Sequence, residues 1–412
     1  MDKLAKNLDI KTTLKATRQR RTNLVLKVYC LKLDKSHLSQ AKLKHLNLLF
    51  AEAKWLYNYM ISLETNLWDF DYKQKQITSL DKDGNKIDRD ISALSSQIRQ
   101  AFVEQVKTNI RSLVGLKKAG KVVGRFKFKS EVNSIPLNQS GVTYKLKRNR
   151  LSIQGFKGSF RIEGTKQLKD VIEFANAKIV RRCGEFYLHV TCYEAPTKRE
   201  STNEIVGLDF GISSTITTSD NENINMKIPE TQRLKRLSRG LARKVKRSAS
   251  YFKQKAKREK EYQHINNQKK DKRNKIVSYL TKRYDRIFTQ DESVKGWHSG
   301  LFGRQVQMSA MGGIIADLKK KSATSVVDKW FPSTQLCECC GKMNKHSLDK
   351  RTYTCGCGHS EPRDFHAAKN ILSEGLSSAW RIRNSKTPAE LNPLLDSNIM
   401  QGLALTQEAA AL

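Results

Sequence analysis

The chain has 412 residues, 38% of them hydrophobic, which is enough apolar material for two or three folded domains. Lysine and arginine number 77 against 40 acidic residues, a formal net charge of +37. Because such a charge repels itself in a compact protein, it predicts a polyanionic partner, with nucleic acid as the first candidate. No apolar run approaches the roughly 20 residues that cross a bilayer, and the first residues lack the apolar stretch of a signal peptide. We therefore expect a cytoplasmic protein with no membrane partner.

Two amphipathic helices are predicted in the N-terminal half. Apolar side chains at helical spacing predict one helix over residues 36–68, with Ser36 as its N-cap, and another over residues 91–116. The polar run DKDGNK at 81–86 is the expected turn between them. We expect these helices to form an insertion over residues 36–118.

Short alternating segments on both sides of the insertion predict β-strands. They cover residues 24–33, 124–129, 151–156, 160–162, 177–181 and 185–193. Together they indicate a β-barrel domain over residues 1–35 and 119–200, interrupted by the helices.

A different organisation follows the polar segment 196–203. Residues 205–210 predict a short apolar strand, and residues 232–274 predict a long basic helix with 17 lysines or arginines against 3 acids. A later strand is expected over residues 286–292. Residues 376–412 are rich in Ser, Asn and Ala, and we expect this tail to be poorly ordered.

The basic segment 232–274 is a candidate surface for nucleic acid. A charged helix is often only a solvated face, and that alternative stays open. Neighbouring charges of one sign repel each other unless phosphates lie between them, which favours contact with an RNA or DNA backbone. The residues expected to make these contacts are Arg233, Lys235, Arg236, Arg239, Arg243, Lys244, Arg247 and Lys257.

Five of the eight cysteines lie between residues 337 and 357, and their spacing predicts a structural zinc site. A C-x-x-C pair and a C-x-C pair, with 14 residues between them, can present four thiolates to one Zn²⁺. The expected ligands are Cys337, Cys340, Cys355 and Cys357. Because the second pair is C-x-C, Cys339 or His359 could replace one of the four. A site closed by four ligands keeps no open position for catalysis.

Two aspartates are candidate catalytic residues. Asp209 ends the apolar strand in GLDFGI, and Asp364 begins a predicted helix in RDFHAAKNI. Each alone is often structural, as a strand end or a helix cap. Their occurrence together, with acids in the later strand, is typical of an RNase H-like nuclease, where carboxylates from two strands and a C-terminal helix hold two Mg²⁺ ions.

At these residues the sequence resembles the TnpB family encoded by insertion sequences, which is similar to the compact type V CRISPR effectors. Four motifs carry the resemblance: GLDFGI at 207–212, VDKWFPSTQLCECCG at 327–341, YTCGCG at 353–358 and RDFHAAKNI at 363–371. The N-terminal half matches only in plan, as a β-barrel wedge domain with a helical recognition insertion.

The resemblance implies an α/β multidomain protein with a RuvC-like (RNase H-like) nuclease domain over residues 201–336 and 358–375 and a zinc-ribbon insertion over residues 337–357. It also implies an RNA-guided DNA endonuclease that binds a guide RNA from the transposon end. Such an enzyme checks a short motif beside its double-stranded DNA target and cuts with two Mg²⁺ ions in a single RuvC site. The expected location is the bacterial cytoplasm, in association with the nucleoid when the protein is bound to DNA.

The sequence departs from the family at the second acidic motif, where Gln290 occupies the usual Glu position. Glu292 lies two residues on, on the same face of an extended strand and about 7 Å along it. We therefore expect Asp209, Glu292 and Asp364 to be the catalytic, Mg²⁺-binding carboxylates. Pro362 and His366 also replace the family's usual Asp and Asn.

Two other classes of protein are alternatives to the nuclease. Gln290 favours a nuclease-dead, RNA-guided DNA-binding repressor with the same scaffold. A basic RNA-binding protein of ribosomal type would explain the charge but leaves the ordered acidic motifs unexplained.

Overall fold

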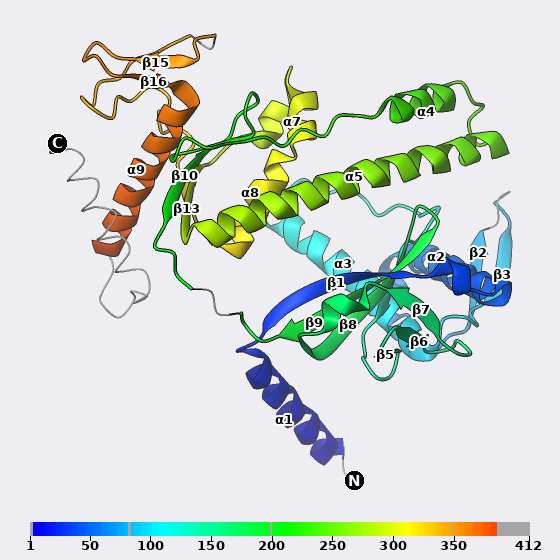
Figure 1. The fold of residues 1–412 in the computed structure, drawn as a ribbon. Helices are drawn as coiled ribbons and strands as arrows, with labels where there is room; N and C mark the ends of the chain where they lie inside the picture. The colour runs from blue at the N-terminus through cyan, green and yellow to red at the C-terminus, as the bar shows by residue number, and fades with distance from the viewer. Residues whose placement is uncertain (1–2, 81–83, 198–199, 348, 385–412) are drawn as a thin grey trace. The chain divides into compact units, whose positions relative to one another are not determined.

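The computed structural model describes residues 3–80, 84–197, 200–347 and 349–384 (Figure 1). The chain divides into two compact units, Met1–Lys198 and Arg199–Leu412, which are described separately. Across these described ranges, every helix is too short or too polar to cross a membrane.

The N-terminal unit contains an antiparallel sheet of seven strands in the order β4-β8-β9-β1-β7-β6-β5. Its strands are β1 (Val25–Leu33), β4 (Ser134–Leu137), β5 (Tyr144–Lys147), β6 (Arg150–Ile153), β7 (Phe160–Glu163), β8 (Val171–Arg182) and β9 (Glu185–Glu194). The hydroxyl of Tyr144 in β5 donates to the carbonyl of Ala175 in β8 over 2.5 Å. This bond joins the end strand β5 to β8, the neighbour of the other end strand β4, so the sheet is nearly closed and barrel-like.

One predicted strand of this unit is wrong, and two strands of the seven-stranded sheet were missed. Residues 124–129 have no strand. There the amide of Asn58 exchanges hydrogen bonds with the backbone of Lys129 over 3.0 and 2.8 Å, in place of a ladder partner. The missed strands β4 and β5 have only four residues each, which is too short for a clear alternating pattern.

The remaining elements of this unit are mostly helical. They are α1 (Lys3–Arg21), η1 (Lys35–His37), α2 (Gln40–Ser62), η2 (Glu64–Asp69), β2 (Gln76–Leu80), β3 (Lys86–Asp90), α3 (Ser96–Lys118) and η3 (Thr165–Leu168). Helix α1 lies in residues 1–35, which the sequence analysis assigned to the β-barrel domain without predicting a helix. The run DKDGNK does not join two helices directly, because β2 and β3 pair around it as an antiparallel hairpin.

The predicted N-cap Ser36 is also wrong. Ser39 caps α2, and its side chain accepts from the backbone N–H of Lys42. Ser36 lies in η1, where its N–H and hydroxyl both donate to the Asp34 carboxylate, so it is already engaged one turn earlier.

The C-terminal unit has a five-stranded sheet in the order β12-β11-β10-β13-β14. Its strands are β10 (Ile205–Asp209), β11 (Ile216–Thr218), β12 (Asn223–Ile224), β13 (Arg286–Gln290) and β14 (Ala323–Val327). Strand β10 is parallel to β13, and β13 is parallel to β14, whereas β11 and β12 continue the other side of β10 in antiparallel fashion. The helices and the small hairpin are α4 (Gln232–Ala242), α5 (Ala249–Arg283), α6 (Val294–Ser299), α7 (Gly303–Ser309), α8 (Met311–Lys321), β15 (Thr352–Thr354), β16 (Ser360–Pro362) and α9 (Arg363–Asn384).

Helices cover both faces of this sheet (Figure 1). Successive residues of a strand point to opposite faces. Val206, Leu208 and Ile287 pack into one buried cluster with α5 and α8. Ile205 and Phe288 lie in a second cluster with α9. The sheet is therefore the middle layer between α5 and α8 on one side and α9 on the other.

Two predictions about helices need correction in this unit. The basic segment is not one helix, because α4 ends at Ala242 and α5 begins at Ala249. Arg247 adopts a left-handed backbone with φ of 70°, and Ser248 then caps α5. The expected tail 376–412 begins as ordered helix, since α9 continues to Asn384. The rest of that prediction lies outside the described residues.

Helix α9 packs on the sheet with no side chain between the two backbones at Gly207. A Cβ at Gly207 would lie 2.2 Å from the carbonyl oxygen of Ala368 in α9. Further along the helix, a Cβ at Gly375 would lie 2.2 Å from the ring of Phe288 in β13. These two close approaches fix how α9 crosses both β10 and β13.

Replacing Gly207 with Ala should therefore destabilise the C-terminal unit by about 1–3 kcal/mol, because the added methyl group meets backbone and α9 must shift. Chemical denaturation measures the change. Gly300→Ala is the matched control, since a Cβ there meets its nearest atom at 3.6 Å, which is ordinary contact. Equal stability of both variants would contradict the close packing.

Candidate functional site

The predicted catalytic acids come from three elements of the C-terminal unit. Asp209 is the last residue of β10, Glu292 follows the end of β13, and Asp364 lies in the first turn of α9. Because β10 and β13 are parallel, their carboxyl ends meet at the same edge of the sheet. The packing of α9 against both strands brings its first turn to that edge.

The electrostatics of Asp209 show that the three carboxylates lie close together. Burial, followed by the negative charges of Asp364 and Glu292, raises the pKa of Asp209 from 3.8 to about 8, against an opposing effect of Arg363. Burial, followed by the charge of Asp291, raises the pKa of Glu292 from 4.5 to about 7. The cluster thus lacks sufficient positive charge of its own, which suits it to binding a cation.

The distances between the carboxylate oxygens of these acids affect whether they could share one cation or would hold two. In the described ranges, the groups whose ligand atoms all lie within 4.8 Å of one another belong to the cysteine-rich region, and the three acids are not among them. One ion bound by all three would need that short spacing. A pair of ions about 3.5–4 Å apart allows ligands that are farther apart.

Gln290 is placed differently from Glu292. Strand β13 ends at Gln290, so the predicted strand 286–292 is two residues too long. Gln290 is buried and its amide is hydrogen-bonded to the segment that follows β14, whereas Glu292 contributes to the charge around Asp209.

The cysteine cluster has the dimensions of a tetrahedral metal site. Cys337 Sγ and Cys357 Sγ are 3.7 Å apart, and Cys340 Sγ and Cys355 Sγ are 3.5 Å apart. A Zn–S distance of about 2.3 Å gives a tetrahedral edge of about 3.8 Å. All four thiols lie within 4.8 Å of one another. The structure therefore brings together the four cysteines that the spacing predicted, as a candidate structural zinc site.

Cys339 and His359 do not join that cluster and instead form a separate group with Glu338. Gly341 and Gly358 have φ of 69° and 93°, and their N–H groups donate to the carbonyls of Cys337 and Cys355 over 3.0 Å. These left-handed turns fold the backbone around the sulfurs. A backbone hydrogen bond from Cys357 holds the pKa of the Cys355 thiol down at about 6, so this sulfur favours the thiolate form that binds metal.

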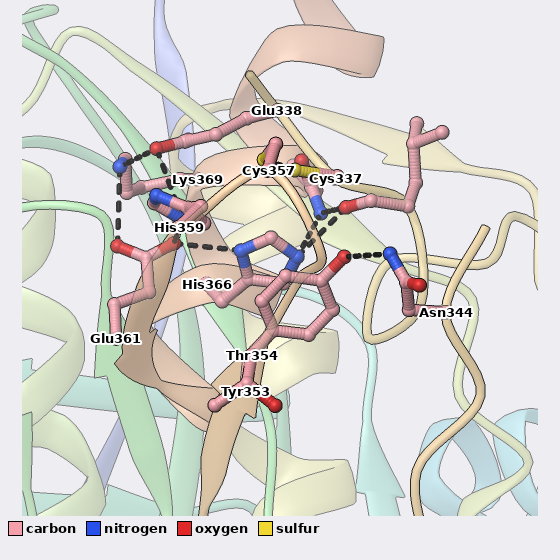
Figure 2. Close-up of polar contacts among 12 residues, drawn as sticks. Cys337, Glu338, Asn344, Tyr353, Thr354, Cys357, His359, Glu361, His366 and Lys369 are labelled. Carbon is pink, nitrogen blue, oxygen red and sulfur yellow. Dashed lines mark hydrogen bonds and ion pairs between the residues drawn. The ribbon is translucent and has the colours of Figure 1, made fainter. Parts of the chain in front are cut away.

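A polar network joins the cysteine-rich region to α9 (Figure 2). His366, fully buried in α9, stacks on Tyr353 of β15 with ring centroids 3.7 Å apart. Its Nδ1 lies 2.6 Å from a carboxylate oxygen of Glu361. Lys369, one turn further on, contacts Glu361 over 3.2 Å and also Glu338. The sequence identified His366 only as a departure from the family and did not predict its contact with Glu361, which lies outside the four motifs.

The predicted nucleic-acid residues lie on a helical hairpin. Helix α4 folds back along α5, with Thr231 bonded to Glu261 over 2.7 Å and the carbonyl of Leu237 accepting from Gln254 over 3.2 Å. Seven of the eight residues are exposed, and Lys235 is half-buried. Arg233 lies 3.4 Å from Glu261, so its charge is partly neutralised.

Cys340→Ser should release the bound metal, because three thiolates and a hydroxyl bind Zn²⁺ far less tightly than four thiolates. Metal analysis should fall from about one zinc per chain towards none, with a lower Tm. Cys339→Ser is the control and should keep its zinc. Loss of zinc from the control, with retention in Cys340→Ser, would mean that Cys339 is the ligand.

The raised pKa values of the acids predict how the metal-free protein responds to pH. From roughly pH 4 to pH 8 the native state keeps protons that the unfolded chain has lost, so the free energy of unfolding falls as pH rises through this window. Asp209→Asn mimics the protonated acid and should remove part of that fall. With EDTA present, the variant should match the parent near pH 4 and exceed it in Tm at pH 8. Parallel Tm profiles would refute the raised pKa.

Two known families match the chain. The family OrfB_IS605, described as "Probable transposase", matches residues 188–296, and the "Cas12f1-like, TNB domain" matches residues 318–371. The first match includes Asp209 and the basic segment, and the second includes the cysteine cluster and Asp364. A solved Cas12f1–sgRNA–target DNA complex aligns with 85% of this chain and 99% of its own at 13% identity and a TM-score of 0.46, a likeness too weak to establish a shared fold.

Curated relatives are provisionally named RNA-guided DNA endonucleases. A protein of Streptomyces pristinaespiralis is 31% identical over 208 residues, covering 48% of this chain and 52% of the relative. InsQ of Escherichia coli K12 is 25% identical, covering 53% and 60%, and a Mycobacterium tuberculosis protein is 23% identical, covering 62% of each. The chain thus spans little more than half the length of these relatives. Together with the two family matches, these relatives confirm the resemblance of the chain to the TnpB family encoded by insertion sequences.

Proposed function

We propose that this protein is an RNA-guided DNA endonuclease that hydrolyses target DNA in a single RuvC-like site. The observation that carries the proposal is the meeting of Asp209, Glu292 and Asp364 at one edge of the sheet, where burial and mutual repulsion raise the pKa of Asp209 to about 8. A strand end or a helix cap has no need of three mutually repelling acids, because each acid alone would serve.

The order of the sheet supports an RNase H-like domain. Numbered by sequence within the unit, β10 to β14 lie in the order 3-2-1-4-5, with the first three strands antiparallel and strands 1, 4 and 5 parallel. Ligands of open α/β sheets bind beyond the carboxyl ends of the strands, where the strand order reverses. That position is the edge at which β10 and β13 end.

The donor set fits Mg²⁺, which prefers carboxylate oxygens and keeps several water ligands. When bound, a pair of Mg²⁺ ions would activate the attacking water and stabilise the charge on the leaving oxygen. The role of Asp209, Glu292 and Asp364 is to hold the ions at the sheet edge. Asp209 is half-buried, so the surrounding protein shields part of the site from bulk water, which strengthens each charge interaction there.

The exposed basic residues of α4 and α5 would contact a nucleic-acid backbone. Arg236, Arg239, Arg243, Lys244 and Arg247 have no acidic partner among the ion pairs of the described residues. The names of the relatives indicate a guide RNA and a DNA target. We extend both partners to this chain, with a guide from the transposon end, a short motif beside the target, and action on DNA in the bacterial cytoplasm.

A nuclease-dead, RNA-guided repressor is the second candidate, and the observation that favours it is Gln290 at the family's usual Glu position. The two candidates differ in one measurable property, because both bind guide and target but only the nuclease cuts.

Asp209→Ala and Asp364→Ala should each reduce Mg²⁺-dependent cleavage by more than about 100-fold, since loss of a metal ligand exceeds the effect of losing an outer-shell partner. Glu292→Gln should have the same effect, because a neutral amide binds Mg²⁺ far less well than a carboxylate. Purified ribonucleoprotein, target DNA and Mg²⁺ suffice for the assay. Normal cutting by Glu292→Gln would exclude Glu292 as a ligand.

A measurement of target-DNA binding distinguishes variants that bind but do not cut from variants that no longer bind. The three acid variants should bind at least as well as the parent, because removal of a carboxylate lowers repulsion of phosphates. Arg243, Lys244 and Arg247 changed together to Glu should instead weaken binding, with a flatter dependence on salt concentration. Full binding without cutting by the unaltered protein would establish the repressor.

A further inference from the structure

Residues 328–336 join β14 to the cysteine-rich region, and we call them the connecting segment. Buried polar side chains hold it from both sides, one group on β13 and one on α9. These are the elements that lead to Glu292 and Asp364, so the hydrogen bonds to this segment bear on how far apart those acids lie.

On the β13 side, the amide of Gln290 holds the beginning of the connecting segment. Its Nε2 lies 3.1, 3.3 and 2.6 Å from the carbonyl oxygens of Asp328, Lys329 and Phe331. Its Oε1 accepts from the hydroxyl of Ser333 over 2.8 Å. Gln290 is only 8% exposed, so both ends of its amide find protein partners where water has little access.

On the α9 side, Asn370 and His366 hold the end of the same segment. Asn370 Nδ2 donates to the carbonyls of Ser333 and Leu336, each over 2.8 Å. His366 Nε2 lies 2.7 Å from the same Leu336 carbonyl. Ser333 is therefore shared, because its hydroxyl donates to Gln290 and its carbonyl accepts from Asn370.

The chemistry at position 290 requires a donor. All three groups around Gln290 Nε2 are carbonyl oxygens, which can only accept hydrogen bonds. A carboxylate has no hydrogen to offer them, and its charge would face three oxygens in a buried place. A Glu at position 290 would thus break the contacts that hold the segment to β13, whatever it could do for a metal ion.

We propose that Gln290 and Asn370 form a clasp around the connecting segment, joined through its residue Ser333, and that this clasp sets the separation of Glu292 and Asp364. Gln290 precedes Glu292 by two residues, and Asn370 follows Asp364 by less than two turns of α9. Gln290 is then a positioning residue and not the remnant of a lost catalytic acid. The inference rests on the proposed nuclease function, in which those two acids bind Mg²⁺.

The experiment compares Gln290→Glu with Asn370→Asp, each of which replaces donors by acceptors on one side of the clasp. The Mg²⁺ concentration for half-maximal cleavage should rise by about 10–100-fold in each, as for other outer-shell partners of metal ligands, while the Kd for target DNA stays unchanged. Gln305→Glu, on the exposed surface of α7 in the same unit, adds the same charge and should behave as the parent. Increased cleavage by Gln290→Glu would overturn the clasp, because it would identify position 290 as a catalytic site.

The double variant provides a second test. If Gln290 and Asn370 hold one segment, their effects should be less than additive, whereas independent sites add. Additive losses would contradict a shared clasp. Ser333→Ala removes only the hydroxyl and tests the clasp even if Gln290→Glu or Asn370→Asp fails to fold. It should also raise the Mg²⁺ concentration needed for half-maximal cleavage. An unchanged requirement in that variant would count against the clasp.

Hydrogen exchange of the protein without added Mg²⁺ separates the clasp from the nuclease proposal, since it needs no activity. Gln290→Glu should speed amide exchange in the connecting segment and also in residues 363–367 at the start of α9. Faster exchange confined to the connecting segment would show that Gln290 does not position α9. A parent protein that binds DNA but does not cut, yet shows the coupled exchange, would refute the nuclease function and retain the clasp.

Discussion

The backbone contact between β10 and α9 at Gly207 is the constraint on which the candidate site depends. With 2.2 Å between a notional Cβ and the Ala368 carbonyl, only glycine lets the helix lie so close to the strand. Asp209 lies two residues after this contact and Asp364 four residues before Ala368, so the crossing point decides whether their carboxylates meet. A larger residue at position 207 would separate the two acids even if both remained in the sequence.

The acids gathered by this contact oppose the charge of the rest of the chain. The protein carries a formal net charge of +37, yet burial and the neighbouring acids outweigh the effect of Arg363 on the pKa of Asp209. The basic side chains on α4 and α5 are largely exposed instead. This separation places positive charge where a phosphate backbone can reach it and leaves a negative site at the sheet edge for cations, so the two kinds of partner do not compete for the same groups.

The cysteine-rich region has a second role beyond holding its own metal. The network of His366, Glu361 and Lys369 and the hydrogen bonds of the connecting segment tie this region to α9. A metal bound by the four thiols would therefore stiffen a support of the helix that carries Asp364, although it takes no part in the chemistry. The candidate metal site and the acidic edge of the sheet are linked through polar groups, which tolerate little change where they are buried because an unpaired member is costly.

Local spacing in the sequence was sufficient to predict that the four cysteines cluster. It also predicted the strand that ends at Asp209 and the helix that begins near Asp364. The cysteine turns, the short apolar strand and the start of the helix are each encoded by neighbouring residues. They can therefore be recognised in the sequence without knowledge of the fold. Tertiary structure alone decided the cap at Ser39, the break between α4 and α5, the extent of α9 and the role of Gln290. The partners of Gln290 are carbonyl groups about forty residues away, and a backbone carbonyl carries no side-chain signature. For that reason the sequence shows which residue replaces the usual Glu, whereas only the folded chain shows what that residue holds.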